Sequence, residues 1–223
     1  LSNLMDKNKN KIDLLFSSMD EWKLQEYLTE KWRKENLVFE GSDYRLVCWE
    51  LMFPSWEIND NRAKWNEISI DFIFYSIELA EFLCIELKNI IKGRRKLLLA
   101  YCQTSQRTIH FIEQYDVRKM QRSMRLSRAH STIERGGIDL MIDQINFSKH
   151  PTVKRVLMAR SYQDNTSEEI DQLNSLNVID LKEQYSGYSK NKDNKEFERF
   201  NAITAEQFSL VDHHPLTIID IDI

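Results

Sequence analysis

Two neighbouring segments of strand-like composition constrain the fold of this chain more than any other feature. Residues 69–75 and 81–89 are rich in Ile, Phe, Tyr and Leu, which favour β-strands, and five residues separate them. We expect the two strands to form an antiparallel hairpin centred between Glu78 and Leu79. The connection contains no Gly, Asn or Pro, although hairpin turns usually depend on such residues.

The charged side chains of these two segments fit one kind of chemistry. In the expected hairpin Asp71 lies directly opposite Glu86, with about 5 Å between the Cβ atoms. Side chains alternate between the faces of a strand, so Glu86 and Lys88 share one face while Leu87 points to the other. One Mg²⁺, with metal–oxygen distances of about 2.1 Å, could bridge the two carboxylates. Two acids and a lysine so placed predict metal-dependent hydrolysis of phosphodiester bonds.

Similar spacings occur elsewhere in the chain, so the surrounding sequence has to decide between them. They are Asp6 with Glu21 and Lys23, Asp164 with Asp180 and Lys182, and the lone acid-x-Lys of Asp193 and Lys195. With 30% charged residues, such matches are expected by chance. These other acids lie in polar or helix-like stretches. Asp71 and Glu86 both lie in strand-like stretches, and we therefore prefer them as the site.

Size and composition indicate one main domain inside the cell. The 223 residues, 42% of them hydrophobic, can bury one sizeable core. Three cysteines, Cys48, Cys84 and Cys102, lack zinc-ligand spacing and suit reduced thiols in a cytoplasmic protein. No apolar run approaches the roughly eighteen residues of a membrane span, and no secretory signal precedes the polar start. We expect a cytoplasmic protein with no membrane partner.

Positive charge is concentrated in one part of the chain. From Lys88 to Arg135 there are twelve Lys and Arg against three acids, a balance of +9, so the remainder of the −4 total is −13. Such a segment would suit a DNA backbone, and a solvated helical face is the alternative. The residues expected to contact DNA are Lys92, Arg94, Arg95, Lys96, Arg107 and Gln103. For Gln103 an ordinary exposed position is the alternative.

The remaining elements follow from periodicity and capping residues. We expect helices at residues 20–35, 92–114, 116–135 and 166–176, and strands at residues 45–53, 152–160 and 178–181. Asp20 would cap the first helix, and Pro54 would end the first strand, with a polar loop at residues 55–67. Residues 185–198 are low in apolar side chains and are expected to be mobile. Residues 216–223 suggest an edge strand or a docking tail.

Glu21 is a further candidate for the site. At 100° per residue it falls within about 20° of Leu28 on the helix, which would turn its carboxylate toward the core side. A first-turn glutamate favoured by the helix dipole is the alternative. The adjacent His213 and His214 would point to opposite faces of a strand, so a loop or tail explains them better than a metal site.

The order of these elements resembles the PD-(D/E)XK nuclease superfamily. That family carries Asp…(Asp/Glu)-x-Lys on the second and third strands of its sheet, and the matching residues are Asp71, Glu86 and Lys88. Residues 20–28 look like the opening helix of RecB-like members, whose glutamate can join the metal site, and Glu21 matches it. Two features depart from the family pattern: Ile70 replaces the proline, and no Gln-x-x-x-Tyr motif follows, because Arg107 comes four residues after Gln103 and His110 four after Gln106.

The resemblance implies an α/β fold with a restriction-endonuclease-like α/β/α core. In that fold helices flank a central mixed sheet of four to five strands. The resemblance covers residues 17–182 and includes a basic helical insertion at about residues 116–145. Residues 1–16 would form an N-terminal arm and residues 183–223 a C-terminal extension.

The resemblance also implies a metal-dependent deoxyribonuclease. Asp71, Glu86 and the Leu87 carbonyl would bind Mg²⁺ or Mn²⁺, Lys88 would orient or help deprotonate the attacking water, and Glu21 would complete a second metal position. DNA is the expected partner, and cutting both strands of a duplex would favour a homodimer. Two alternatives stay open: a catalytically inactive nuclease-like fold that binds nucleic acid or protein, and an unrelated α/β protein in which Glu86 and Lys88 are a surface pair.

Overall fold

The structure is a computed structural model that describes most of the chain. The described residues are 20–56, 63–116, 144–145, 147, 151–163, 165–188 and 194–221. The expected N-terminal arm at residues 1–16 and nearly all of the expected basic insertion lie outside these ranges. Within them, no helix has both the length and the apolar composition needed to cross a bilayer.

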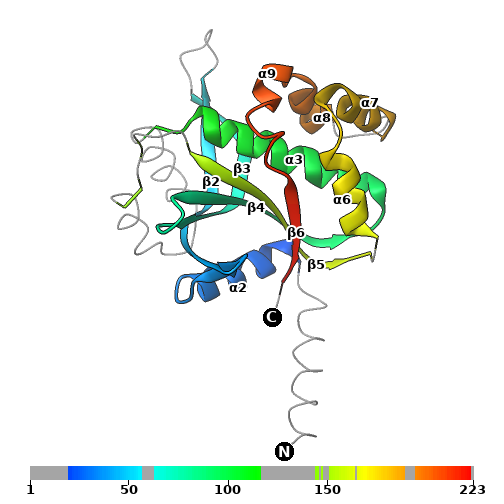
Figure 1. Cartoon of the computed structure of the whole chain (residues 1–223). Coiled ribbons are helices and arrows are strands. Elements are labelled where there is room, and N and C mark those ends of the chain that lie inside the picture. Colours follow the sequence, from blue (N-terminus) through cyan, green and yellow to red (C-terminus); the bar gives the residue numbers. More distant parts are fainter. Residues whose placement is uncertain are drawn as a thin grey trace, which may run out of the picture.

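A six-stranded mixed sheet forms the centre of the described fold (Figure 1). Its strands, in spatial as well as chain order, are β1 (Leu37–Phe39), β2 (Ser42–Trp56), β3 (Ala63–Ser76), β4 (Glu81–Ile91), β5 (Thr152–Tyr162) and β6 (Leu216–Asp220). The first four strands are antiparallel, whereas β5 runs parallel to β4 and β6 parallel to β5. The expected α/β class is confirmed, but the sheet has six strands rather than four to five, because β1 and β6 add an edge strand at each side.

The hairpin of β3 and β4 has the register expected from the sequence. Phe72 pairs with Ile85 and Ser76 pairs with Glu81. This register places the centre of the hairpin between Glu78 and Leu79. The turn contains no glycine, yet Ala80 adopts a φ of 52°, in the left-handed region. An alanine there accepts a conformation that glycine adopts without cost, which explains why the turn carries no sequence signal.

Pro54 does not end the second strand. It lies inside β2 and pairs with Trp65, next to a shift of register between Met52 and Pro54. A bulge of this kind tolerates a residue without an N–H. The strand end expected at residue 53 is therefore wrong, as is the loop expected at residues 55–67, because β3 begins at Ala63.

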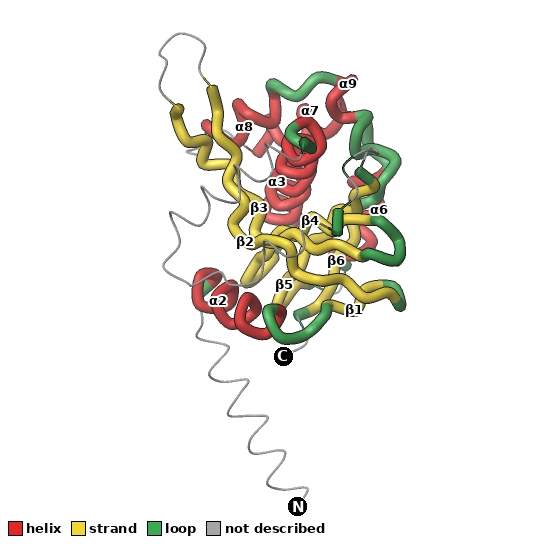
Figure 2. The backbone as a smooth tube through the Cα atoms, turned by 90° about the vertical axis from the view of Figure 1, so that its left-hand side faces the viewer, coloured by secondary structure: helices red, strands yellow, loops and turns green. Residues whose placement is uncertain are grey.

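Helices cover both faces of the sheet (Figures 1 and 2). On one face lies α2 (Glu21–Trp32), capped by Asp20 as expected, and the Trp32 ring meets the rings of Phe72 and Phe74 with centroids 5.0 Å apart. On the other face lies α3 (Arg94–Glu113), where Phe111 meets Phe82 at 5.2 Å. Four shorter helices pack around α3: α6 (Thr166–Asn174), α7 (Val178–Tyr188), α8 (Asn194–Asn201) and α9 (Ala205–Phe208).

The C-terminal part belongs to the same fold, which changes two expectations. Residues 178–181 are not a strand but the first turn of α7, because the Asn177 side chain caps it and accepts hydrogen bonds from the N–H groups of Ile179 and Asp180. The division expected at residues 182/183 falls inside α7. Parts of the segment expected to be mobile are helical in α7 and α8. The expected edge strand near the C-terminus is confirmed as β6, paired with β5.

Candidate functional site

The candidate site lies where β3 and β4 separate. Their pairing ends at Phe72 and Ile85. Beyond this point β3 continues beside β2, where Ile70 pairs with Leu51, and β4 continues beside β5. Asp71 and Glu86 are the first residues past the last pair, so their side chains stand at an open fork in the sheet.

Asp71 compensates for the missing strand partner at the fork. Its Oδ2 accepts a hydrogen bond from the Leu87 N–H at 2.7 Å. The carboxylate thus takes the position of a backbone carbonyl and joins β3 to β4 one step past their ladder. This contact involves the N–H of Leu87, and the ligand role expected of its carbonyl stays a prediction.

Glu86 is buried and binds a cationic side chain with each of its oxygens. The residue is only 1% exposed. Lys88 Nζ donates to Oε1 at 2.7 Å, and Arg107 Nη1 donates to Oε2. Lys88 therefore lies on the same face as Glu86, as strand alternation predicts. Because Glu86 is buried, the alternative of a surface strand pair does not describe this site.

Arg107 links the two acids. Its Nη1 lies 3.9 Å from Asp71 Oδ1 in addition to its hydrogen bond with Glu86. Arg107 is among the residues expected to contact DNA. In the structure α3 directs its guanidinium to the two carboxylates, and a contact with DNA stays a prediction. The chain around Arg107 gives no local signal for this placement, since it depends on how α3 crosses the β4 face.

The charges at the fork are strongly coupled. Burial by itself would raise the pKa of Glu86, but the positive charges of Arg107 and Lys88 and their hydrogen bonds hold that pKa below its ordinary value. Burial would lower the pKa of Lys88, but Glu86, Asp71 and Glu21 together raise it. Glu86 is therefore ionised and Lys88 protonated near neutral pH.

Asp71 behaves in the opposite way. Burial, followed by repulsion from the ionised Glu86, raises its pKa to about 8, although Arg107, Lys88 and the Leu87 N–H act against the shift. Functional sites often contain two neighbouring carboxylates whose pKa values are shifted in opposite directions, as they are for Asp71 and Glu86.

Glu21 reaches the site from α2. Its Oε1 lies 3.6 Å from Lys88 Nζ, which places a third acid near the lysine. Glu21 is exposed and does not enter the core, but its carboxylate lies on the side of α2 that faces Lys88 of the sheet. It lies in the first turn of α2, and its role in a second metal position stays a prediction.

The other five residues expected to contact DNA fall into three groups. Lys92, Arg95 and Lys96 are at the junction of β4 and α3, and all three are exposed. Arg94 donates instead to the side chains of Gln172 and Gln184. Gln103 is half-buried on α3.

The fork has the donor chemistry for a hard cation. Asp71 and Glu86 are oxygen donors that converge on one positive group, the guanidinium of Arg107. The described residues contain no cluster of three or more acidic, His or Cys side chains suited to a metal. Mg²⁺ commonly keeps several waters and uses one or two carboxylates. The two acids therefore fit Mg²⁺ once the guanidinium of Arg107 has moved away from the two carboxylates.

No protein-family model, curated protein or solved structure matches this chain. The geometry of the fork is therefore the basis for a functional assignment.

Proposed function

We propose that this protein is a metal-dependent nuclease that hydrolyses DNA phosphodiester bonds at the fork between β3 and β4. The observation that carries the proposal is the convergence of Asp71, Glu86 and Lys88 at one partly buried point. The element order of α2, three antiparallel strands, α3 and the parallel β5 supports a restriction-endonuclease-like core.

Asp71 and Glu86 are the residues that would hold Mg²⁺ or Mn²⁺. When bound there, the ion supplies positive charge against the scissile phosphate and acidifies a water. Glu86 is already ionised, whereas the raised pKa of Asp71 means that this carboxyl holds a proton for much of the time near neutral pH.

Lys88 acts as a charged hydrogen-bond donor. Its pKa is raised by the surrounding acids, so it keeps its proton and is better suited to steady a phosphate oxygen and orient water than to act as a base. Glu21 and Glu86 restrict the ammonium group from two sides. Lys92, Arg95 and Lys96 extend the positive charge from the end of β4 to the start of α3, where they would contact the DNA backbone.

The test is a cleavage assay on single-stranded, duplex and branched DNA and on RNA, with Mg²⁺, Mn²⁺ or EDTA. We expect metal-dependent cleavage of DNA and a rate at least about 100-fold lower for Lys88→Met, with the variant still folded at the assay temperature as judged by circular dichroism. Lys154→Met is the matched control, because Lys154 is also a strand lysine paired with acids, Glu40 and Glu81, but lies away from the fork. Folded wild-type protein that cuts none of these substrates would refute the proposal.

A second candidate function is favoured by the position of Arg107. Because its guanidinium already neutralises Glu86, the fold could bind nucleic acid without cutting it. Titration with Mn²⁺ by calorimetry separates the two candidates. A nuclease should bind the ion and lose that binding in Asp71→Asn, whereas a binding module should bind nucleic acid with no site for the ion.

A further inference from the structure

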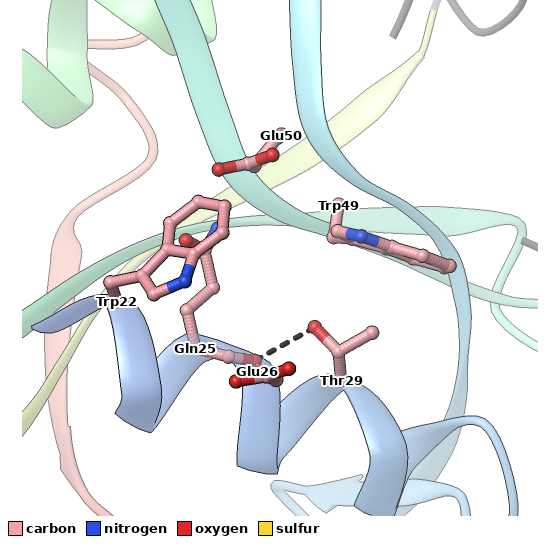
Figure 3. A pocket seen from close by; sticks show the side chains of 6 residues that line it. All are labelled: Trp22, Gln25, Glu26, Thr29, Trp49 and Glu50. Atoms are coloured by element: carbon pink, nitrogen blue, oxygen red, sulfur yellow. Dashed lines mark hydrogen bonds between the residues drawn. The ribbon is translucent and has the colours of Figure 1, made fainter. Parts of the chain in front are cut away.

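Two hollows border α2, and they differ in the room that they offer. The hollow between α2 and β2, where Trp22 and Trp49 stand on opposite sides, has room for about one water (Figure 3). The second is a groove of about 590 Å³, lined by Leu28 and Trp32 of α2, Met158 of β5 and both outer strands of the sheet, β1 and β6. Clefts of about 300–1,000 Å³ commonly hold a ligand, so only the groove is large enough for an occupant.

The groove is the gap left by a curled sheet. Although β1 and β6 are at opposite ends of the strand order, β1 returns to the first residues of β5. The Lys154 ammonium of β5 lies 2.6 Å from the carboxylate of Glu40, which follows β1, and 5.6 Å from the ring centre of Phe39. The two outer strands therefore border one groove, and the sheet is a half-barrel with an open seam between β6 and β1 (Figure 2).

The outer edge of β6 has backbone groups that can pair with one more strand. The Ile221 N–H donates to the Ala159 carbonyl of β5 at 3.2 Å. Successive residues of a strand direct their backbone groups to opposite sides, so those of Ile218 and Asp220 point away from β5. In the strand order of the described residues, β6 has β5 as its one neighbour.

The first position of this outer row is already paired. Both backbone groups of Leu216 bond to the Asn174 side chain, at 2.9 and 3.0 Å. The row is thus oriented for hydrogen bonding, and a strand laid beside it would continue from the place where Asn174 stops.

Residues 12–16 have the pattern of a strand for this seam. Ile12, Leu14 and Phe16 alternate with Asp13 and Leu15, which in a strand places three large apolar side chains on one face. The segment is as long as β6, which has five residues. Residues 1–19 lie outside the described residues, and the chain enters the described fold at Asp20, directly before α2.

This entry point lies within reach of the end of β6. Glu21 Oε1 is 3.6 Å from Lys88 Nζ, and Lys88 pairs with Ala159, which in turn pairs with Asp220. Neighbouring strands are about 4.8 Å apart, so Asp220 is about 10 Å from Lys88 across the sheet. Residues 17–20 span up to about 14 Å when extended, so the five residues before them can run along β6 in the parallel direction.

We propose that residues 12–16 dock in the groove of their own chain as a strand between β6 and β1. The proposal does not depend on the proposed function. The outer edge of β6 supplies the backbone hydrogen bonds, and the apolar face of the segment covers the groove. Leu14 then lies opposite Ile219, because Ile219 pairs with Met158 and both line the groove. Docking covers two open sheet edges, which proteins commonly protect.

A cysteine pair tests this position in the full chain. Leu14→Cys with Ile219→Cys should form an intrachain disulfide under mild oxidation, because residues opposed in neighbouring strands have Cα atoms about 5 Å apart. The matched control is Leu14→Cys with Ile179→Cys, at an isoleucine on α7 that is 63% exposed, and it should cross-link at least about tenfold less. The native Cys48, Cys84 and Cys102 are buried and do not compete.

Amide exchange, followed by NMR, measures the backbone pairing. The Ile218 N–H should exchange at least about tenfold more slowly in wild type than in Leu14→Asp, whose new charge opposes docking. The Ile221 N–H is the internal control, because its bond to Ala159 should protect it equally in both proteins.

The outcomes separate this proposal from its rivals. A Leu14–Ile219 disulfide no more frequent than the control, or equal exchange of the Ile218 N–H in both proteins, would overturn it. Disulfides between two chains, seen as covalent dimers on a non-reducing gel, would also overturn it and assign the groove to a second copy. Intrachain cross-linking in a protein that cuts no DNA would uphold the docked strand and refute the nuclease alone.

Discussion

The side chain of Asn174 pairs with the backbone of Leu216 through two hydrogen bonds. Asn174 Oδ1 accepts from the Leu216 N–H at 2.9 Å, and its Nδ2 donates to the Leu216 carbonyl at 3.0 Å. The amide thus acts like a neighbouring strand at the start of β6 and fixes that strand to the end of α6. This contact joins the C-terminal segment to the sheet.

Asn174→Leu should therefore destabilise the protein. The substitution leaves the Leu216 N–H and carbonyl without partners, and we expect the free energy of unfolding to fall by about 2 kcal/mol. Urea denaturation measures this change in the free energy of unfolding. Asn165→Ala is the control, because the Asn165 side chain is exposed and donates to the exposed Glu169 carboxylate rather than to a strand. Equal stability of the two variants would contradict this role for Asn174.

Arg155 is a buried cation that holds β5, α3 and the C-terminal turn together. It is 1% exposed. Its Nε and Nη2 donate to the His214 carbonyl at 2.9 and 2.6 Å, and its Nη1 donates to Ser105 Oγ at 2.6 Å. Burial lowers the pKa of Arg155, although Tyr101, Asp212 and Cys102 act against the shift.

We expect both Arg155→Met and Arg155→Lys to be destabilising by about 2–4 kcal/mol. Methionine removes both donors to the His214 carbonyl and the hydrogen bond that Ser105 Oγ accepts, although Ser105 still donates to the Tyr101 carbonyl. Lysine cannot reproduce the planar fork of the guanidinium. Thermal and urea unfolding measure the loss. Lys154→Met, at the adjacent half-exposed position on β5, should change stability by less than about 1 kcal/mol. A stable Arg155→Lys variant would argue against the importance of the forked geometry.

The hairpin at the site could be predicted from the sequence, and the fork could not. Strand composition and alternation were sufficient for the register, since both act locally along residues 69–89. The separation of the strands after Phe72 and Ile85 depends on which other strand each one joins. The position of Arg107 likewise depends on the packing of α3 against β4, which no local pattern records.

Two short segments, residues 178–181 and the region of Pro54, adopt structures that differ from their intrinsic preferences. Residues 178–181 contain Val and Ile, which favour strands, but the side chain of Asn177 caps a helix there and packing extends it to Tyr188. Pro54 is usually a strand terminator, but the register shift beside it lets β2 continue. In both cases a tertiary or capping contact outweighs the intrinsic preference.

His110 should make stability depend on pH. Burial lowers its pKa, the charge of Arg199 on α8 lowers it further, and Glu113 acts in the opposite direction. Below pH of about 6.5 the unfolded chain takes up a proton that the folded protein resists, so the free energy of unfolding falls as the pH falls.

His110→Gln should remove this contribution. We expect the variant to lose less stability than wild type between pH 7 and pH 5, and the two proteins to show parallel profiles above pH 7.5. Urea denaturation at several pH values measures the difference. Identical slopes between pH 7 and pH 5 would show that His110 titrates alike in the folded and unfolded states.

Arg107 should compete with a divalent cation for the two acids. Its guanidinium contacts Glu86 and lies 3.9 Å from Asp71, so an ion that binds both carboxylates has to displace it. A charge-assisted hydrogen bond of this kind contributes about 1.5–3 kcal/mol. Arg107→Gln should therefore bind Mn²⁺ about tenfold more tightly than wild type, as measured by calorimetry.

Arg94→Gln is the matched control for this competition. Arg94 lies on the same helix but donates to Gln172 and Gln184, away from the acids, so its replacement should leave the affinity for Mn²⁺ unchanged. Asp71→Asn in the Arg107→Gln background should abolish the gain, because the ion then lacks one of its two carboxylates. An affinity in Arg107→Gln equal to that of wild type would mean that the guanidinium and the ion do not share a position.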